Sequence, residues 1–149
     1  MSLKTLKKTM NENYKIVSKF IKDISSETPD VETYLYVKDF IQKYQLNIEI
    51  NSKPLKAQII EVNTLLKFHD ISKSKKRSHF EMTYTSVIKL NEQIEDKKIL
   101  QKIILCDVQK EIYPELEKAL LNLLHTSGYP NIKFEKKVDF EKLYNQRFN

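Results

Sequence analysis

The sequence predicts an α+β fold: a four-stranded antiparallel sheet with one long connection between strands, followed by C-terminal helices packed on one face. Segments with a period of two fill the first part of the chain, and a helical period begins at Glu95. Strands first and helices last is the order typical of α+β domains. The 149 residues suit one domain. We expect a flexible basic N-terminal tail at 1–13 and a single domain at 14–149.

Alternating side chains mark the strands. From Ile59 to His69 and from His79 to Leu90, apolar and polar residues alternate, which places the two kinds on opposite faces of an extended chain. The polar stretch 70–78 between them suits the tip of an antiparallel hairpin. Two earlier strands are predicted, one from Tyr14 to Ser26 with its apolar residues on one side, and a shorter one. Their inward residues are expected to be Tyr14, Ile16, Phe20 and Ile24, and Leu46, Ile48 and Ile50.

Three helical segments are predicted after Glu95. Apolar residues recur there every three or four positions, and Pro114 suits the first turn of a second helix, where its missing N–H would be unpaired anyway. Gly128 can take the left-handed conformation that ends this helix. A last helix is expected to begin after Asp139, which is a good N-cap.

Leucines nearly encircle the second of these helices. A helix that is apolar on two sides must bury both of them, and a small sheet can pack against only one side. We therefore expect the other side to lie in a subunit interface, most simply a symmetric one. The interface residues predicted on this basis are Leu120, Leu121 and Leu124.

Charge and reactive residues limit the classes of function. The net charge is +6, but the excess is concentrated in 1–22 and in the loop 72–79, whereas the rest of the chain is net negative. This is not the spread of basic and aromatic side chains typical of nucleic-acid binders. The three histidines are far apart in the sequence and there is one cysteine, so no cluster of metal ligands and no catalytic nucleophile is indicated. A single glycine does not suffice for a glycine-rich phosphate-binding loop. We predict no enzyme and no cofactor, and interpret Cys106 as a small buried apolar residue.

No apolar run approaches the length of a membrane span, and no apolar stretch follows the N-terminal lysines. We expect a cytoplasmic protein. The segment from Thr28 to Tyr44 shows no clear period but is rich in aromatic residues. Rigid aromatic side chains offer a large contact area at small entropic cost, which suits a surface that grips apolar partners, although they could equally fill the domain's own core.

The order of several short motifs resembles the SecB family of export chaperones. The first is the run 21–29, Ile-Lys-Asp-Ile-Ser-Ser-Glu-Thr-Pro, and the second is Tyr113-Pro114. The third is 127–134, Ser-Gly-Tyr-Pro-Asn-Ile-Lys-Phe, followed by Val138-Asp139-Phe140 and Leu143-Tyr144. Each motif alone is short, but together and in register they cover about residues 14–148.

This resemblance implies a fold and an activity. It implies a crossover connection after the first strand and a dimer of dimers, with helices between two eight-stranded sheets. The implied activity is that of a holdase, which keeps unfolded precursor proteins competent for export without ATP and passes them to the SecA motor. By position, the client-binding residues would be Tyr34, Tyr36, Phe40, Tyr44, Phe140, Leu143 and Tyr144. The acidic residues that would dock SecA are Asp23 and Glu27. A third docking acid of the family falls near Thr83, where Glu81 is the nearest carboxylate.

Two alternatives remain open. Within the same fold, the chain could be a chaperone dedicated to one partner, such as an antitoxin. From another class, it could be a basic nucleic-acid-binding protein that uses the Lys-rich start and the loop from Lys73 to Arg77.

Overall fold

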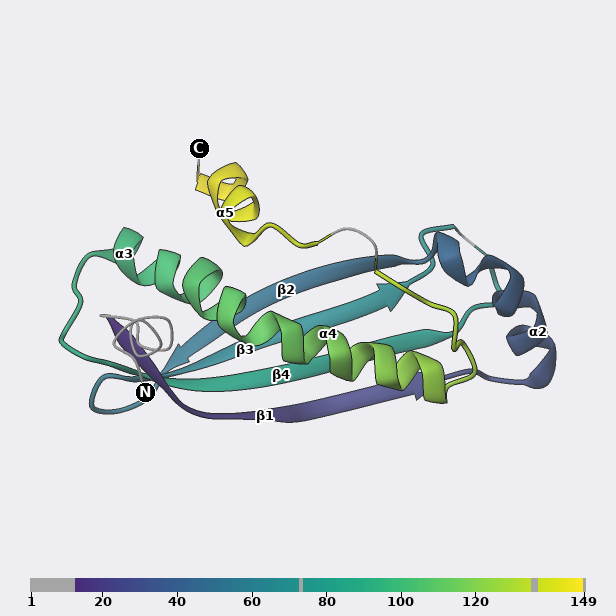
Figure 1. Ribbon diagram of the computed structural model, residues 1–149, viewed down its shortest axis with the longest axis horizontal. Coiled ribbons are helices and arrows are strands. Elements are labelled where there is room, and N and C mark those ends of the chain that lie inside the picture. Colours follow the sequence, from purple (N-terminus) through teal and green to yellow (C-terminus); the bar gives the residue numbers. More distant parts are fainter. Residues whose placement is uncertain (1–12, 73, 135–136, 149) are drawn as a thin grey trace, which may run out of the picture.

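The computed structural model describes residues 13–72, 74–134 and 137–148, so the predicted tail at 1–13 lies almost wholly outside the described residues. Four strands form one antiparallel sheet in the order β1-β4-β3-β2. The predicted α+β architecture is confirmed (Figure 1). In chain order the elements are β1 (Tyr14–Glu27), α2 (Val31–Phe40), a 3-10 turn (Ile41–Lys43), β2 (Gln45–Pro54), β3 (Ile59–His69), β4 (His79–Leu90), α3 (Lys97–Lys102), a π-helical turn (Ile103–Asp107), α4 (Val108–Thr126) and α5 (Phe140–Phe148).

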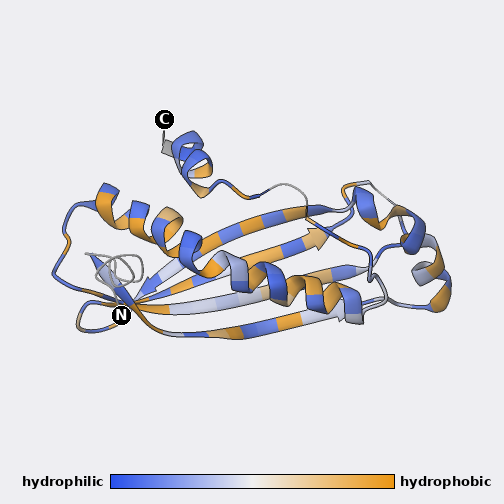
Figure 2. Cartoon of the chain, in the orientation of Figure 1, coloured by the Kyte–Doolittle hydropathy of each residue, from blue (hydrophilic) through white to orange (hydrophobic). Residues whose placement is uncertain are grey.

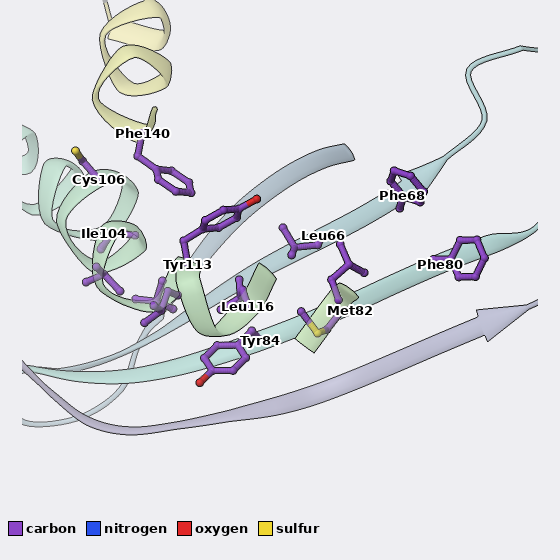
Figure 3. Close-up of a cluster of buried hydrophobic side chains, with 14 of the residues drawn as sticks. Leu66, Phe68, Phe80, Met82, Tyr84, Ile104, Cys106, Tyr113, Leu116 and Phe140 are labelled. Carbon is purple, nitrogen blue, oxygen red and sulfur yellow. The ribbon is translucent and has the colours of Figure 1, made fainter. Parts of the chain in front are cut away.

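The helices α3 and α4 cover one face of the sheet, here called the inner face (Figure 1). On β3 the buried side chains alternate as the sequence predicts except at Asn63, which is buried on the opposite face, and Leu66 has no exposed surface. Aromatic and aliphatic side chains of β3 and β4 meet those of α4 in one core (Figure 3). Leu116, Leu120 and Leu124 recur on α4 at four-residue spacing and are fully buried. Each such leucine contributes roughly 1.5–3 kcal/mol to folding.

The subunit-interface prediction therefore needs a correction at two of its three leucines. Leu120 and Leu124 are already buried within a single protomer, because they face the sheet, so they have no surface left for another subunit. Leu121 is only partly buried, so its role in a subunit interface stays a prediction.

Strand β1 departs from the predicted alternation. Its pairing with β4 shifts between Ile16 and Ser18 and again between Ile21 and Asp23, and each bulge adds one residue that reverses the facing of those that follow. Phe20 is paired with Thr85 and so lies on the outer face, not with Tyr14 and Ile16 as expected. Ile21 takes its place on the inner face, and Ile24 returns there after the second bulge.

The helical part also differs from the prediction. The chain is helical without interruption from Lys97 to Thr126, and Pro114 lies in the interior of α4 rather than in a first turn. Proline has no N–H to donate to the carbonyl four residues earlier. Because Pro114 is exposed, water can hydrogen-bond to that carbonyl instead. Gly128 has φ of +109°, which confirms it as the stop. Asp139 accepts a 3.0 Å hydrogen bond from the backbone N–H of Lys142, which confirms the cap of α5.

A polar pair joins α4 to the sheet inside the core. The hydroxyl of Thr64 donates to Oε1 of Gln109 at 2.7 Å, and Nε2 of Gln109 donates to the carbonyl of Ile104 in the π-helical turn at 3.1 Å. Both side chains are fully buried. The pair is tolerated in the core because each polar group has a partner.

Replacing Gln109 with leucine should cost about 1–3 kcal/mol of unfolding free energy, because the buried hydroxyl of Thr64 is then left without an acceptor. The double variant Thr64→Val/Gln109→Leu should recover most of that loss, since neither partner remains to be satisfied. Urea denaturation of the single and double variants measures both values. A double variant as unstable as Gln109→Leu would contradict this account.

The aromatic segment after β1 is helical, which the sequence analysis missed. Asp30 caps α2 by accepting the backbone N–H of Thr33 at 2.7 Å, and this hydrogen bond lowers the pKa of the Asp30 carboxyl. Thr33, Val37 and Ile41 are buried at four-residue spacing. The crossover is therefore a short helix and a 3-10 turn that pack at the end of the sheet (Figure 1).

Candidate functional site

A hollow of about 860 Å³ lies beside the edge strand β2. Its floor is aromatic, because Tyr44, Phe68 and Tyr113 are buried side chains that contribute to its lining. The rest of the lining comes from β2 and its approach, from the chain between α4 and α5, and from α5: Gln42, Gln45, Leu46, Asn47, Ile48, Asn131, Ile132, Lys133, Phe134, Val138 and Leu143. The hollow thus has an aromatic floor and a rim in which polar and apolar side chains are mixed.

A second, smaller hollow of about 330 Å³ continues along β2 under α5, and the two share Ile48 and Leu143. Its other lining residues are Glu49, Ile50, Leu105, Phe140, Tyr144 and Arg147. We refer to the two hollows together as the β2 groove. Because β2 pairs with β3 alone in the described sheet, one side of its backbone faces the groove without a neighbouring strand.

Helix α5 forms the far wall of the groove and is anchored at its start. The ring of Phe140 meets that of Tyr113 edge-on, with centroids 5.3 Å apart (Figure 3). Nζ of Lys110 lies 2.6 Å from a carboxylate oxygen of Glu141. The next apolar residue of the helix, Leu143, projects into the groove and remains about half exposed. The anchoring fixes where this exposed leucine lies.

The phenols of the floor are neutral near pH 7. Burial, with the charge of Glu117 adding to it, raises the pKa of Tyr113 to about 12. Burial also raises the pKa of Tyr44, whose hydroxyl oxygen accepts the backbone N–H of Ser78 at 3.0 Å. The floor is therefore uncharged, but its three rings are at most 7% exposed. The apolar surface that a ligand would meet comes mainly from the partly buried Leu46, Ile48 and Phe134 and from the half-exposed Leu143.

The structure separates the predicted client-binding residues into two groups. Tyr44, Phe140, Leu143 and Tyr144 line the groove, although Tyr44 and Phe140 are buried and present little surface. The other three lie on α2, outside the groove lining: Tyr34, Tyr36 and Phe40.

Within the α2 group, Tyr34 has a packing role. Its ring stacks on Tyr129 with centroids 5.5 Å apart, and its hydroxyl donates to the carbonyl of Gly128 at 2.8 Å. Tyr36 and Phe40 are exposed and contact each other, with centroids 4.8 Å apart. Sequence reasoning missed the groove residues of β2 and the chain before α5, including Ile48 and Phe134, whose contribution depends on long-range packing.

The predicted docking acids lie on the outer face of the sheet, away from the groove. Asp23 pairs with Thr83 and Glu27 with His79, and paired residues of antiparallel strands point to the same face. Glu81 pairs with Ser25, so it is exposed on this same face between the two acids.

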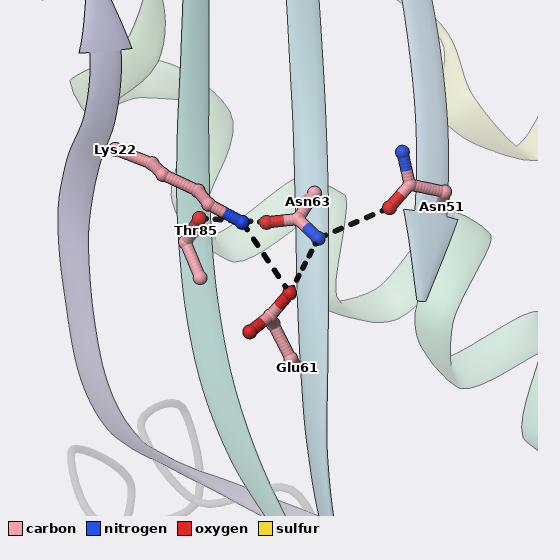
Figure 4. Close-up of polar contacts among 5 residues, drawn as sticks. All are labelled: Lys22, Asn51, Glu61, Asn63 and Thr85. Carbon is pink, nitrogen blue, oxygen red and sulfur yellow. Dashed lines mark hydrogen bonds and ion pairs between the residues drawn. The ribbon is translucent and has the colours of Figure 1, made fainter. Parts of the chain in front are cut away.

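Near them the outer face carries a polar network (Figure 4). Asn63, which is buried, accepts the hydroxyl of Thr85 and donates to Asn51 and Glu61, and Lys22 pairs with Glu61 at 3.6 Å. Across the described ranges, no three His, Cys, Asp or Glu side chains come close enough to hold a metal ion. In those same ranges, no helix is long and apolar enough to cross a bilayer.

Comparison with known proteins identifies the family. The family model of the preprotein translocase subunit SecB matches residues 7–149. The chain belongs to the SecB family. A SecB relative from Pelagibacter ubique, provisionally named protein-export protein SecB, is 61% identical over 94% of this chain and its own full length. The protein-export protein SecB of Azorhizobium caulinodans is 24% identical over 89% of this chain and 81% of its own.

The fold of the family is shared by a solved structure, the SecB-like chaperone of Mycobacterium tuberculosis in complex with a peptide from the HigA1 antitoxin. It superposes with a TM-score of 0.61 at 9% identity and covers 85% of this chain and 91% of its own. Membership in the SecB family makes this chain a SecB-like chaperone of protein export.

Proposed function

We propose that this chain is an ATP-independent holdase that binds unfolded precursor proteins in the β2 groove and keeps them competent for export. The observation that carries the proposal is the groove itself, in which partly exposed apolar side chains lie over an aromatic floor beside an unpaired strand edge. An unfolded chain has apolar side chains and unpaired backbone groups, and the groove offers partners for both. A cytoplasmic location is part of this proposal.

The experiment that tests it follows the aggregation of a chemically unfolded protein by light scattering, without nucleotide. The chaperone should suppress scattering at a stoichiometric ratio of chaperone to client, and ATP should change nothing. Aggregation that proceeds at the same rate with and without the chaperone would refute the holdase proposal.

Delivery to the SecA motor is proposed to use the outer face. Asp23 and Glu27 are exposed there, and Glu81 between them supports a docking surface of three carboxylates on two neighbouring strands. The triple change Asp23→Asn/Glu27→Gln/Glu81→Gln should weaken retention of purified SecA while leaving suppression of client aggregation intact. Equal retention by both forms would remove the outer face from this role.

We also propose a homotetramer built as a dimer of dimers. Strand β1 is the other edge of the described sheet and exposes four apolar side chains, Val17, Phe20, Ile21 and Ile24. An exposed apolar edge strand is a template for pairing with another chain, and pairing two β1 strands would make an eight-stranded sheet. Light scattering of the purified protein measures the assembly, and a monomer at micromolar concentration would contradict it.

A chaperone dedicated to one partner is the second candidate. It is favoured by the solved SecB-like neighbour, which holds an antitoxin peptide. The two candidates differ in breadth: a general holdase should protect several unrelated unfolded proteins, whereas a dedicated one should protect a single partner.

A further inference from the structure

One end of the molecule is built from the helix α2 and the hairpin loop between β3 and β4. We call residues 28–44, 70–72 and 74–78 the α2 tip; it lies beyond the ends of the strands (Figure 1). Three contacts hold the two segments together: Thr28 and Ser78 hydroxyls at 2.7 Å, the hydroxyl of Tyr44 with the N–H of Ser78 at 3.0 Å, and Lys76 with Glu32 at 3.8 Å.

The α2 tip exposes large apolar side chains that the β2 groove does not use. Val31 is 72% exposed, Leu35 54% and Ile71 58%, and none of them lines either hollow. Tyr36 and Phe40 add an exposed aromatic pair on the next stripe of α2. Figure 2 shows apolar and polar residues alternating over this end. So many exposed apolar side chains at one end indicate an interaction surface.

Basic side chains are exposed on the same two segments. The described ones are exposed and come from both segments: Lys38, Lys43, Lys75, Lys76 and Arg77. Lys38 lies one turn after Leu35, and Nζ of Lys43 lies 5.5 Å from the ring centre of Phe40.

The α2 tip also carries four carboxylates against its five described basic groups. Asp30 accepts the N–H of Thr33, Asp70 accepts that of Ser72, and Glu32 pairs with Lys76, while Asp39 is exposed. The tip therefore combines exposed apolar side chains with a small net positive charge, which is concentrated in the consecutive residues Lys75, Lys76 and Arg77.

We propose that the α2 tip docks this protein on an anionic lipid bilayer. Lysine and arginine near a membrane surface attract anionic head groups, and neighbouring apolar side chains enter the boundary between head groups and acyl chains. Nucleic acid also carries phosphates, but it has no apolar phase in which the exposed aliphatic side chains of Val31, Leu35 and Ile71 would be buried. Those aliphatic residues favour lipid.

The test is co-sedimentation of the full-length protein with vesicles. Binding to phosphatidylglycerol mixed with phosphatidylcholine should exceed binding to phosphatidylcholine alone, and salt should weaken it. Neutralising Lys75, Lys76 and Arg77 to glutamine should lower the affinity on the order of a hundredfold at low salt. The change Val31→Ser/Leu35→Ser should also lower it, at an unchanged lipid charge.

A matched triple change elsewhere, Lys53→Gln/Lys89→Gln/Lys118→Gln, removes the same charge from exposed sites on β2, β4 and α4 and should bind nearly as wild type. Equal binding to both kinds of vesicle, or equal losses in the two triple variants, would overturn the proposal. So would binding to single-stranded RNA with no binding to vesicles. Suppression of client aggregation is followed in parallel, so that a failed holdase and a failed lipid site give different results.

Discussion

Replacing Gly128 with alanine is expected to destabilise the protein by about 2–5 kcal/mol, the largest stability effect that we predict for a single methyl group. Gly128 has φ of +109°, a conformation that residues with a Cβ atom rarely adopt. A Cβ atom added there would lie 2.5 Å from Cε1 of Tyr34, which is too close for any real contact. Backbone strain and the clash with the ring act together.

The two contributions can be separated with a second change. Tyr34 is held by its stacking on Tyr129 and by its hydrogen bond to the carbonyl of Gly128, so the ring cannot move without losing both. Tyr34→Ala removes the ring, and adding Gly128→Ala to that variant should cost only the backbone strain, about 1–3 kcal/mol. Thermal or urea unfolding of the four proteins gives the coupling between the two positions.

Tyr34→Phe is the control for the hydrogen bond alone and should cost about 1 kcal/mol. A Gly128→Ala protein that unfolds at the wild-type denaturant concentration would mean that the connection between α4 and the following chain adjusts freely. The same result would remove the reason for a glycine at the end of this helix.

The sequence predicted best those elements whose pattern is local. The strands Ile59–His69 and His79–Leu90 were predicted with the bounds that the structure has, because one face of each packs on the helices and apolar and polar residues alternate over most of each strand. The bulges of β1 cannot be recognised from the sequence pattern, because they depend on how β1 pairs with β4. As a result, Phe20 lies on the face opposite to the predicted one.

Helix α2 was missed for a different reason. Its buried stripe begins at the polar residue Thr33, and its exposed side carries Val31 and Leu35, so apolarity does not distinguish the two sides. The cap by Asp30, just after a proline, was the available signal.

Only part of the candidate site could be predicted from the sequence. Leu143 and Tyr144 were assigned through the family motifs, and the structure places them in the β2 groove. The floor comes from residues far apart in the chain, Tyr44, Phe68 and Tyr113, which only the tertiary fold brings together. The buried side of α4 illustrates the same limit, because the pattern could not tell a protomer core from a subunit interface.

Leu143→Glu is expected to weaken client binding by roughly 10–100-fold, because it puts a charge where an apolar side chain of the client would pack. Leu143 is 47% exposed and lines both hollows of the groove, so the change should leave the free energy of unfolding within about 1 kcal/mol of wild type. The measurement is the chaperone concentration that halves the aggregation of an unfolded client.

Leu55→Glu is the matched control, since Leu55 is 46% exposed and lines neither hollow. It introduces the same charge at an equally exposed leucine in the turn between β2 and β3 and should retain wild-type activity. If both variants lose activity equally, net charge rather than the groove governs binding. If neither does, clients bind elsewhere, and the exposed pair of Tyr36 and Phe40 on α2 becomes the next surface to test.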